Sequence, residues 1–222
     1  MRLTLFDLDG TLLQGDSDHA FGEWVINQGW AQRQAYQARN DAFYADYLAG
    51  RLDIHAYIDF ATEAWRDRPS QELTDAQWGF MHQVIEPQLH PAALDLVQGH
   101  LRAGDCVALV TATNDFITLP IAQRLGIQNL LATELARDPL GRVLGTIAGT
   151  PCFREGKINR VEQWLADRGQ RLSDFERCTF YSDSTNDLPL LERVSHPVAT
   201  NPSPALERIA SERAWPVLKL FT

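Results

Sequence analysis

The sequence has few cysteines and no long hydrophobic run. Its three cysteines, Cys106, Cys152 and Cys178, are an odd number with wide spacing, which indicates neither a disulfide framework nor a metal-binding pair. The longest apolar stretches, such as residues 107–110, are far shorter than the roughly 20 residues that a transmembrane helix needs. We therefore expect neither structural disulfides nor a membrane protein.

The sequence also has no cluster of basic residues. It contains 20 lysines and arginines against 29 aspartates and glutamates, which gives a net charge of −9. Binding to nucleic acid or to an anionic membrane surface is therefore not expected. A chain of this charge can still bind a phosphate group where a divalent cation and one or two basic side chains lie beside it.

The first residues do not contain the apolar segment of a signal peptide. Met1 is followed by a short apolar run and then by an acidic cluster that begins at Asp7. This leaves no room for a hydrophobic core and a cleavage site. We expect a cytoplasmic protein.

The 222 residues contain two kinds of segment. Residues 1–13 and 87–222 contain short apolar runs rich in β-formers, separated by helical stretches, which is typical of a parallel sheet with helices on both faces. Residues 14–86 contain roughly four helical stretches and almost no strand signal. The sequence therefore predicts a doubly wound, mainly parallel α/β core of the Rossmann-like kind, interrupted by a small all-helical cap domain.

The expected elements of the core are short. The strands are 3–6, 106–110, 130–134, 178–182 and 197–199, and the helices are 92–102, 116–125 and 157–168. Residues 137–142 are rich in turn residues between two β-prone segments, which predicts a hairpin.

Polar residues directly follow three of these strands. Asp7, Thr111 and Asp183 each come at the carboxyl end of a strand, the edge at which open α/β sheets bind ligands. Any one of them has a simpler interpretation, because such residues commonly cap the next helix. With Asp9 and Asp187, however, several carboxylates would face one another across neighbouring strands. Such a cluster repels itself unless a hard cation binds, and oxygen ligands without histidine or cysteine favour Mg²⁺.

This arrangement suits the hydrolysis of a phosphate monoester. Mg²⁺ and one ammonium group can neutralise the phosphate while the Asp7 carboxylate attacks phosphorus in line and forms an acyl phosphate. Asp9 can protonate the leaving alcohol and then activate the water that hydrolyses the intermediate. Thr111 and Lys157 are the candidates to hold the phosphoryl oxygens.

Four motifs, in this order, resemble those of haloacid dehalogenase-like phosphatases. They are Asp7-Leu8-Asp9-Gly10-Thr11, Thr111 after an apolar strand, Lys157, and Asp183-Ser184-Thr185-Asn186-Asp187. The helical insert after the first motif resembles the cap of the phosphoserine-phosphatase-like branch of that superfamily.

The resemblance implies a role for each motif residue. Asp7 would be the nucleophile and a Mg²⁺ ligand, and Asp9 the general acid/base that also ligates the metal through its carbonyl. Asp183 would be the third protein ligand, and Asp187 would orient the metal shell. Asn186 would contact phosphate or substrate.

Two departures from the family pattern bear on the substrate. Phosphoserine phosphatases have a glutamate nine residues after the nucleophile, where it meets the substrate's ammonium group, whereas this chain has Asp16. Thr111-Ala112-Thr113-Asn114 also stands where serine followed by glycines is usual. Residues 14–24 instead resemble the start of the cap in bacterial relatives that act on histidinol phosphate. We expect histidinol phosphate as the substrate, with phosphoserine or another amino alcohol phosphate as the alternative.

The start of the cap has side chains that suit such a substrate. Asp16, Asp18 and Glu23 can bind an ammonium or imidazolium group, and Phe21 or Trp24 can pack against a ring. The alternative is structural: Asp16 or Ser17 would cap the first cap helix, and Phe21, Trp24 and Val25 would form its buried stripe.

Other functions use the same residue types. A signalling receiver combines an aspartyl phosphate, magnesium, threonine and lysine on a doubly wound sheet, but its motifs follow another order and it has no helical insert. A carbon–halogen hydrolase of the same superfamily has no leaving alcohol and does not need Asp9. Phosphotransfer to an alcohol stays open, as do a contact between Arg51 and a substrate carboxylate and a homodimer formed through the apolar face of the cap.

Overall fold

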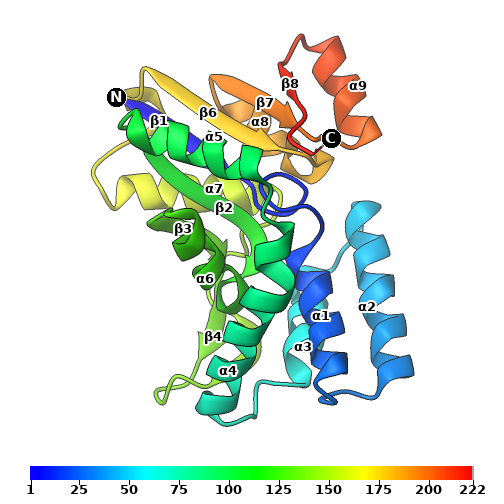
Figure 1. The fold of residues 1–222 in the computed structure, drawn as a ribbon. Coiled ribbons are helices and arrows are strands. Elements are labelled where there is room, and N and C mark those ends of the chain that lie inside the picture. Colours follow the sequence, from blue (N-terminus) through cyan, green and yellow to red (C-terminus); the bar gives the residue numbers. More distant parts are fainter. Residues whose placement is uncertain (222) are drawn as a thin grey trace.

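A six-stranded sheet, parallel throughout, forms the centre of the protein. The computed structural model describes residues 1–221. The strands are β1 (Arg2–Phe6), β2 (Cys106–Asn114), β3 (Asn129–Thr133), β6 (Arg177–Ser182), β7 (His196–Thr200) and β8 (Val217–Leu218). Their order across the sheet is β3-β2-β1-β6-β7-β8 (Figure 1). The first strand of the chain therefore lies between β2 and β6.

Helices cover both faces of this sheet. They are α5 (Pro91–Arg102), α6 (Asp115–Leu125), α7 (Glu155–Ala166), α8 (Leu188–Arg193) and α9 (Pro204–Glu212). In β2, Val107 and Leu109 share a core with α5 and α6, whereas Ala108 and Val110 share one with α7, α8 and α9. Successive strand residues point to opposite faces, so a continuous apolar run suits a strand buried on both. Figure 1 shows α5 in front of the sheet and α7 behind it. The predicted doubly wound fold is confirmed.

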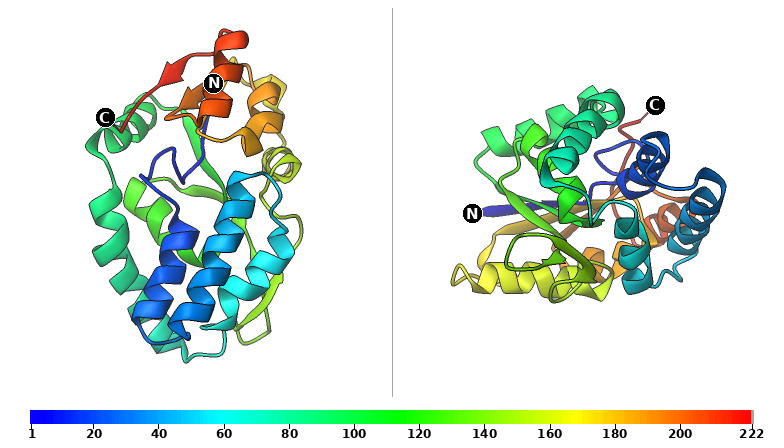
Figure 2. Two further views of the ribbon diagram at one scale, coloured as in Figure 1. Left: turned by 90° about the vertical axis from the view of Figure 1, so that its right-hand side faces the viewer. Right: turned by 90° about the horizontal axis from the view of Figure 1, so that it is seen from below.

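Four α-helices form the insert between β1 and α5. They are α1 (Ser17–Asn27), α2 (Arg33–Leu48), α3 (Ile54–Glu63) and α4 (Ser70–Phe80), followed by a π-helical turn over Met81–Ile85 and a 3₁₀ turn over Glu86–Gln88. Aromatic rings form their shared core: Phe21 packs edge-on against Phe80 and Trp65. Trp65 also stacks on Phe116 of α6, with 4.5 Å between ring centroids. The helical insert is therefore packed onto the α6 side of the sheet, and Figure 2 shows α1, α2 and α3 side by side.

The predicted hairpin is present and touches the insert. It consists of β4 (Leu135–Arg137) and β5 (Val143–Ile147), which pair antiparallel, and β5 contacts α3. Gly145 lies so close to the Arg66 guanidinium that a β-carbon at this position would overlap it. Arg66 in turn donates to Asp59 of α3 at 2.6 Å. The hairpin thus gives the insert a second contact with the core.

Some boundaries differ from those expected. β2 runs four residues beyond the predicted end, to Asn114, where it pairs with Thr133 of β3 after an irregularity in register. These residues are mostly polar, so they gave no apolar strand signal. α7 begins at Glu155, two residues earlier than predicted, and α8, α9 and β8 were not predicted.

The insert buries its apolar face inside the chain. Phe21, Trp24 and Val25 of α1 are 3%, 8% and 0% exposed, so this face is covered without a second copy, and a homodimer stays a prediction. Within residues 1–221, no helix combines the length and apolar character needed to cross a membrane. The three cysteines are free.

Candidate active site

Three polar residues lie on adjacent strands at one rim of the sheet. Asp7 follows β1, and its backbone N–H donates to the carbonyl of Tyr181 in β6 at 2.9 Å. Asp183 comes directly after β6, and Thr111 lies in β2 just beyond the segment that pairs with β1. This is the carboxyl-end rim at which open α/β sheets bind ligands.

Lys157 lies in the interior between two carboxylates. Its Nζ donates to Asp7 Oδ1 at 2.8 Å and to Asp187 Oδ2 at 2.7 Å, and the Ser182 hydroxyl donates to the same Asp187 oxygen at 2.8 Å. Lys157 is 2% exposed. Burial disfavours its charge, but the carboxylates of Asp187 and Asp7 outweigh burial and raise the pKa of Lys157. One buried ammonium group therefore forms ion pairs with two buried carboxylates.

Asp7 combines burial with access to the active-site cavity. It is 3% exposed, and its second oxygen accepts from the Thr11 hydroxyl at 3.4 Å. Burial raises the pKa of Asp7 to about 7, an effect that the charge of Lys157 opposes and that of Asp187 reinforces. A carboxylate that is poorly solvated and held on one side by an ammonium group suits a nucleophile.

The surroundings of Asp183 fit a hard divalent cation. Asp183 lies so close to Gly10, whose φ is 71°, that a β-carbon at Gly10 would overlap the carboxylate. Asp183 Oδ1 is buried and has no hydrogen-bond partner among residues 1–221. Burial, followed by the charges of Asp7 and Asp187, raises the pKa of Asp183. An unpartnered carboxylate oxygen among like charges is what Mg²⁺ would satisfy, and a bound cation would reverse these pKa shifts.

Asp9 is held by donors from two parts of the chain. Its Oδ1 accepts from the backbone N–H of Ser17, the first residue of α1, at 2.6 Å, and its Oδ2 accepts from the Thr113 hydroxyl at 2.7 Å. Burial and the charge of Asp16 raise the pKa of Asp9 to about 7, although both hydrogen bonds oppose the shift. A carboxyl group with this pKa can donate and accept a proton near neutral pH.

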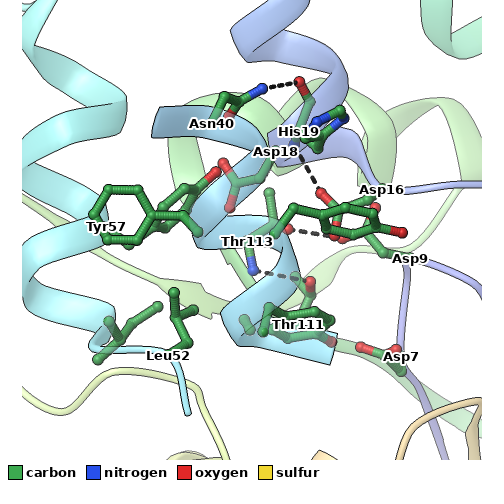
Figure 3. A pocket seen from close by; sticks show the side chains of 15 residues that line it. Asp7, Asp9, Asp16, Asp18, His19, Asn40, Leu52, Tyr57, Thr111 and Thr113 are labelled. Carbon is green, nitrogen blue, oxygen red and sulfur yellow. Dashed lines mark hydrogen bonds between the residues drawn. The ribbon is translucent and has the colours of Figure 1, made fainter. Parts of the chain in front are cut away.

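A cavity of about 480 Å³, its open mouth included, joins the rim of the sheet to the insert. From the core it is lined by Asp7, Asp9, Thr111, Ala112 and Thr113, and from the insert by Asp16, Asp18, His19, Asn40, Phe43, Tyr44, Tyr47, Leu52, Ile54 and Tyr57. Figure 3 shows Asp7 and Asp9 on one side of it and Tyr57 and Leu52 on the other.

Two acidic residues at the start of α1 face this cavity. Asp16 caps the helix, because its Oδ1 accepts from the backbone N–H of His19 at 2.7 Å. Asp18 Oδ1 accepts from Asn114 Nδ2, at the end of β2, at 2.9 Å. Burial raises the pKa of both carboxyl groups. Asp16 therefore caps α1, as the structural interpretation predicts, and it also lines the cavity, so its contact with a substrate stays a prediction.

Aromatic residues form a wall of the cavity that the sequence analysis did not identify. Asn40, Tyr44 and Tyr47 lie three or four residues apart and therefore share one face of α2, and Tyr57 of α3 lines the same cavity. The Tyr44 ring lies 4.8 Å from the ring of His19. The signal was this spacing of polar and aromatic residues within one helix of the insert.

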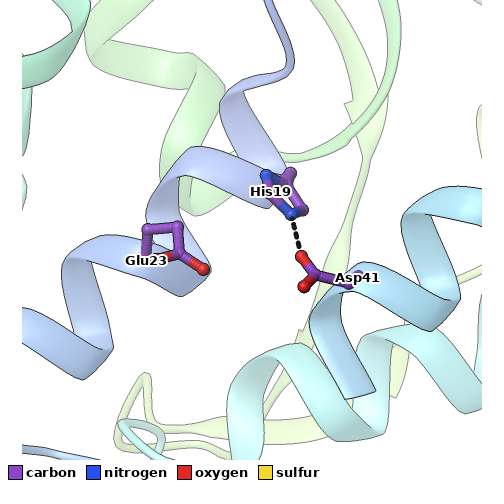
Figure 4. A group of neighbouring side chains, drawn as sticks. All are labelled: His19, Glu23 and Asp41. Atoms are coloured by element: carbon purple, nitrogen blue, oxygen red, sulfur yellow. Dashed lines mark hydrogen bonds and ion pairs between the residues drawn. The ribbon is translucent and has the colours of Figure 1, made fainter. Parts of the chain in front are cut away.

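Glu23 does not line the cavity in the structure. It lies one turn after His19 on α1, near Asp41 of α2, which binds His19 Nε2 at 2.9 Å (Figure 4). Phe21 and Trp24, considered as ring contacts, are buried in the core of the insert. For these two residues the structural interpretation applies.

Asn186 and Arg51 also lie away from the cavity lining. The Asn186 amide donates to the backbone carbonyl of Tyr47 in the last turn of α2 at 3.1 Å, which joins the core to the insert. The Arg51 side chain is 69% exposed and pairs with Asp46 at 2.8 Å. Among the described residues that line the cavity there is no arginine or lysine; Lys157, Asp183 and Asp187 are not part of the lining either, and Lys157 reaches it only through its bond to Asp7. A substrate carboxylate would therefore find no cationic partner there.

Comparisons with known proteins identify relatives along the whole chain. A family model described as haloacid dehalogenase-like hydrolase matches residues 4–192. A protein of Neisseria meningitidis serogroup C (strain 8013) named histidinol-phosphatase is 44% identical over 217 residues, covering 98% of each chain.

Two solved structures resemble this one. A protein of unknown function from Bordetella pertussis Tohama I has a TM-score of 0.93 and 48% identity, covering 99% of each chain. A substrate-bound phosphoserine phosphatase has a TM-score of 0.69 at 18% identity, covering 97% of this chain and 91% of its own. At that identity the second comparison supports the fold alone.

Proposed function

The chain belongs to the haloacid dehalogenase-like hydrolase family and is a phosphatase, and on that premise we propose that it hydrolyses histidinol phosphate with Mg²⁺ through a phosphorylated Asp7. The main observation behind this proposal is that the buried ammonium group of Lys157 contacts the carboxylates of Asp7 and Asp187. The carboxyl group of Asp183 lies near these two carboxylates.

In the first step, Asp7 attacks the phosphorus of the bound monoester. A bond forms between its carboxylate oxygen and phosphorus while the bond from phosphorus to the leaving oxygen breaks, and that bond's electron pair stays on the leaving oxygen. Lys157 orients Asp7 through their 2.8 Å contact. The Lys157 ammonium and the Thr111 hydroxyl bind the phosphoryl oxygens.

Asp9 transfers the proton in both steps. It first gives its proton to the leaving oxygen, which departs as an alcohol, and so becomes a carboxylate. In the second step that carboxylate takes a proton from the water that attacks phosphorus, and the bond between phosphorus and Asp7 breaks. Asp7 and Asp9 return to their starting states, and inorganic phosphate leaves.

Three groups of the chain would hold Mg²⁺: the Asp7 carboxylate, the Asp9 carbonyl and the Asp183 carboxylate. Asp187 would orient the metal shell. Bound Mg²⁺ would supply charge neutralisation for the phosphoryl group as the bond to the leaving oxygen breaks. The buried, unpartnered Asp183 Oδ1 supports this assignment.

The helical insert, residues 14–86, selects the substrate in this proposal. Asp16 and Asp18 bind its ammonium and imidazolium groups, and Tyr44 and Tyr57 pack against the ring. On the side of the insert the described cavity lining is acidic and aromatic, which supports a substrate without a carboxylate there. The name of the Neisseria relative supports the same substrate.

Other substrates and reactions predict different behaviour. Phosphoserine would place a carboxylate among Asp16 and Asp18, which costs free energy unless a cation accompanies it. Phosphoethanolamine would use the acidic residues but not the aromatic wall. A receiver would keep its aspartyl phosphate, and a phosphotransferase would pass it to an added alcohol, whereas Asp9 beside the site favours hydrolysis.

The test is phosphate release from histidinol phosphate, phosphoserine, phosphoethanolamine and a sugar phosphate, with Mg²⁺ or with a chelator. We expect release that needs Mg²⁺, is fastest from histidinol phosphate and disappears in Asp7→Asn. A preference for phosphoserine would reject the substrate but keep the reaction. Full activity in chelator or in Asp7→Asn would reject the mechanism.

A cytoplasmic location is also part of the proposal. It is supported by the free state of all three cysteines, because reducing compartments keep thiols unpaired. Gel filtration across a concentration series would decide between a monomer and the homodimer that the sequence left open.

A further inference from the structure

Thr113 forms a hydrogen bond with Asp9, the proposed general acid. It lies near the end of β2, two residues after Thr111, and its hydroxyl donates to Asp9 Oδ2 at 2.7 Å. This distance is typical of a charge-assisted hydrogen bond. Thr113 is 4% exposed, and its own backbone N–H donates to the Thr111 hydroxyl oxygen at 3.2 Å. The side chain is therefore fixed on the strand that carries the phosphate-binding threonine.

The Asp9 carboxyl group is held at both of its oxygens. Ser17 donates from the insert to one oxygen, and Thr113 donates from the sheet to the other. Two donors on different elements set both the direction and the plane of the carboxyl group. Thr113 is the donor that belongs to the sheet, so it ties Asp9 to the element that also bears Thr111.

We propose that Thr113 is a positioning residue for proton transfer, an inference that rests on the proposed function. Its hydroxyl holds the Asp9 carboxyl group toward the leaving oxygen in the first step and toward the attacking water in the second. Asp9 donates its proton as the bond from phosphorus to the leaving oxygen breaks, and it accepts one as water adds.

A pair of esters separates this role from a general weakening of the fold. Histidinol phosphate has an alkyl leaving group that needs a proton, whereas 4-nitrophenyl phosphate releases a stable anion that does not. A positioned general acid contributes ~10²–10⁴-fold to rate. In Thr113→Val we therefore expect kcat/KM for histidinol phosphate to fall by ~10-fold or more, while kcat/KM for 4-nitrophenyl phosphate changes little.

The second step gives an independent signature. With 4-nitrophenyl phosphate, Thr113→Val should release a burst of nitrophenolate close to one equivalent per enzyme and then turn over slowly, because water attack on the aspartyl phosphate also needs Asp9. Thr113→Ser keeps the hydroxyl and should restore both the ratio of the two kcat/KM values and the wild-type time course.

Matched variants exclude a structural explanation. Thr62 is a buried threonine whose hydroxyl donates to the carbonyl of Ile58 in its own helix, so Thr62→Val should leave the ratio unchanged. Thr113→Ala, which makes no large demand on packing, serves as the second variant should Thr113→Val not fold. The inference is overturned if Thr113→Val or Thr113→Ala lowers kcat/KM equally for both esters, or lowers it for neither ester.

The experiment also distinguishes failure of the inference from failure of the proposed function. If wild-type protein hydrolyses both esters with Mg²⁺ and Thr113→Val leaves the ratio unchanged, the inference alone is wrong. If wild-type protein releases phosphate from neither ester, the proposed function is wrong and the inference falls with it.

Discussion

The two ends of the active-site cavity are built differently. At the phosphate end, Asp7 lines the cavity, and Lys157, which lies outside the lining, bonds to both Asp7 and Asp187 within 2.8 Å. At the cap end, Asp18 is anchored through one oxygen by Asn114 and otherwise meets an aromatic wall across the cavity. Under the proposed function, the reaction would therefore depend on partners already present in the chain, whereas selection of the substrate would depend on partners that the substrate brings.

Substitutions that keep the shape of a side chain and remove its charge test this difference between the two ends. At the phosphate end such a change should abolish the reaction with every substrate or lower the stability of the fold. At the cap end it should weaken one substrate and spare others.

The largest effect is expected from Asp7→Asn. An amide of the same shape cannot form the acyl phosphate, and catalysis of phosphate monoester hydrolysis requires acceleration up to ~10²¹-fold. We expect phosphate release from histidinol phosphate and from 4-nitrophenyl phosphate to fall below detection. Asp53→Asn is the matched control, because Asp53 caps α3 and asparagine caps equally well. Residual activity above ~1% of wild type in Asp7→Asn would argue against a covalent intermediate on this residue.

The next largest effect is expected on stability, from Lys157→Met. Removing one partner of a buried ion pair leaves uncompensated charge and typically costs about 3–5 kcal/mol, and here two carboxylates, Asp7 and Asp187, lose their cation. Urea unfolding at pH 8 with a chelator measures the loss. Lys219→Gln removes an exposed pair with Glu207, for which ~0–1 kcal/mol is expected. Equal losses in the two variants would show that the phosphate end is not a network.

At the cap end, Asp18→Asn should act on one substrate. The amide oxygen can still accept from Asn114, but the charge that faces a substrate cation is gone, and a hydrogen bond to a charged group contributes about 1.5–3 kcal/mol. We expect KM for histidinol phosphate to rise by ~10–100-fold, with a smaller change in kcat and little change for 4-nitrophenyl phosphate.

Asp75→Asn is the control for this prediction, because Asp75 is exposed on α4 and lies outside the cavity lining. A change in kcat without a change in KM would place Asp18 in the reaction rather than in recognition. An equal rise in KM for both esters would remove the distinction between the two ends of the cavity.

The phosphate end was the more predictable of the two from sequence. Asp7, Thr111 and Asp183 follow apolar runs that identify strands, and the carboxyl ends of parallel strands meet at one rim whatever the details of packing. Lys157 needed the resemblance to the family, because a lysine within a helix gives no signal of its own that it will be buried beside Asp7. The fold class followed from the same apolar runs and their alternation with helices.

The cap end depends on how helices are turned against one another. The sequence identified Asp16 and Asp18 at the start of α1 but also suggested Glu23, which the packing of α1 on α2 places outside the cavity. Tyr44 and Tyr57 were missed because periodicity shows which residues share a face, not what that face meets. Thr113 was missed as a site residue because β2 continues through polar residues beyond its apolar run.

The smallest effect is expected on the pH dependence of stability, and it tests whether the phosphate end needs a cation. The pKa values of Asp7 and Asp9 are raised from 3.8 to about 7, chiefly by burial. A carboxyl group whose pKa is higher in the folded state favours folding when protonated, and this contribution is lost as pH rises through 7.

In a chelator, the Tm should therefore increase as pH falls from 8 to 6, by ~2–4 °C for each kcal/mol regained in a chain of this size. Mg²⁺ binds the ionised carboxylates, so it should raise the Tm more at pH 8 than at pH 6 and flatten the profile. Asp7→Asn removes one of these two groups and should reduce the slope in chelator, whereas Asp75→Asn, which changes an exposed residue of α4, should not. A Tm that does not change between pH 6 and 8 without Mg²⁺ would mean that Lys157 alone compensates the charges of the buried carboxylates. The phosphate end would then not need a bound cation for its stability.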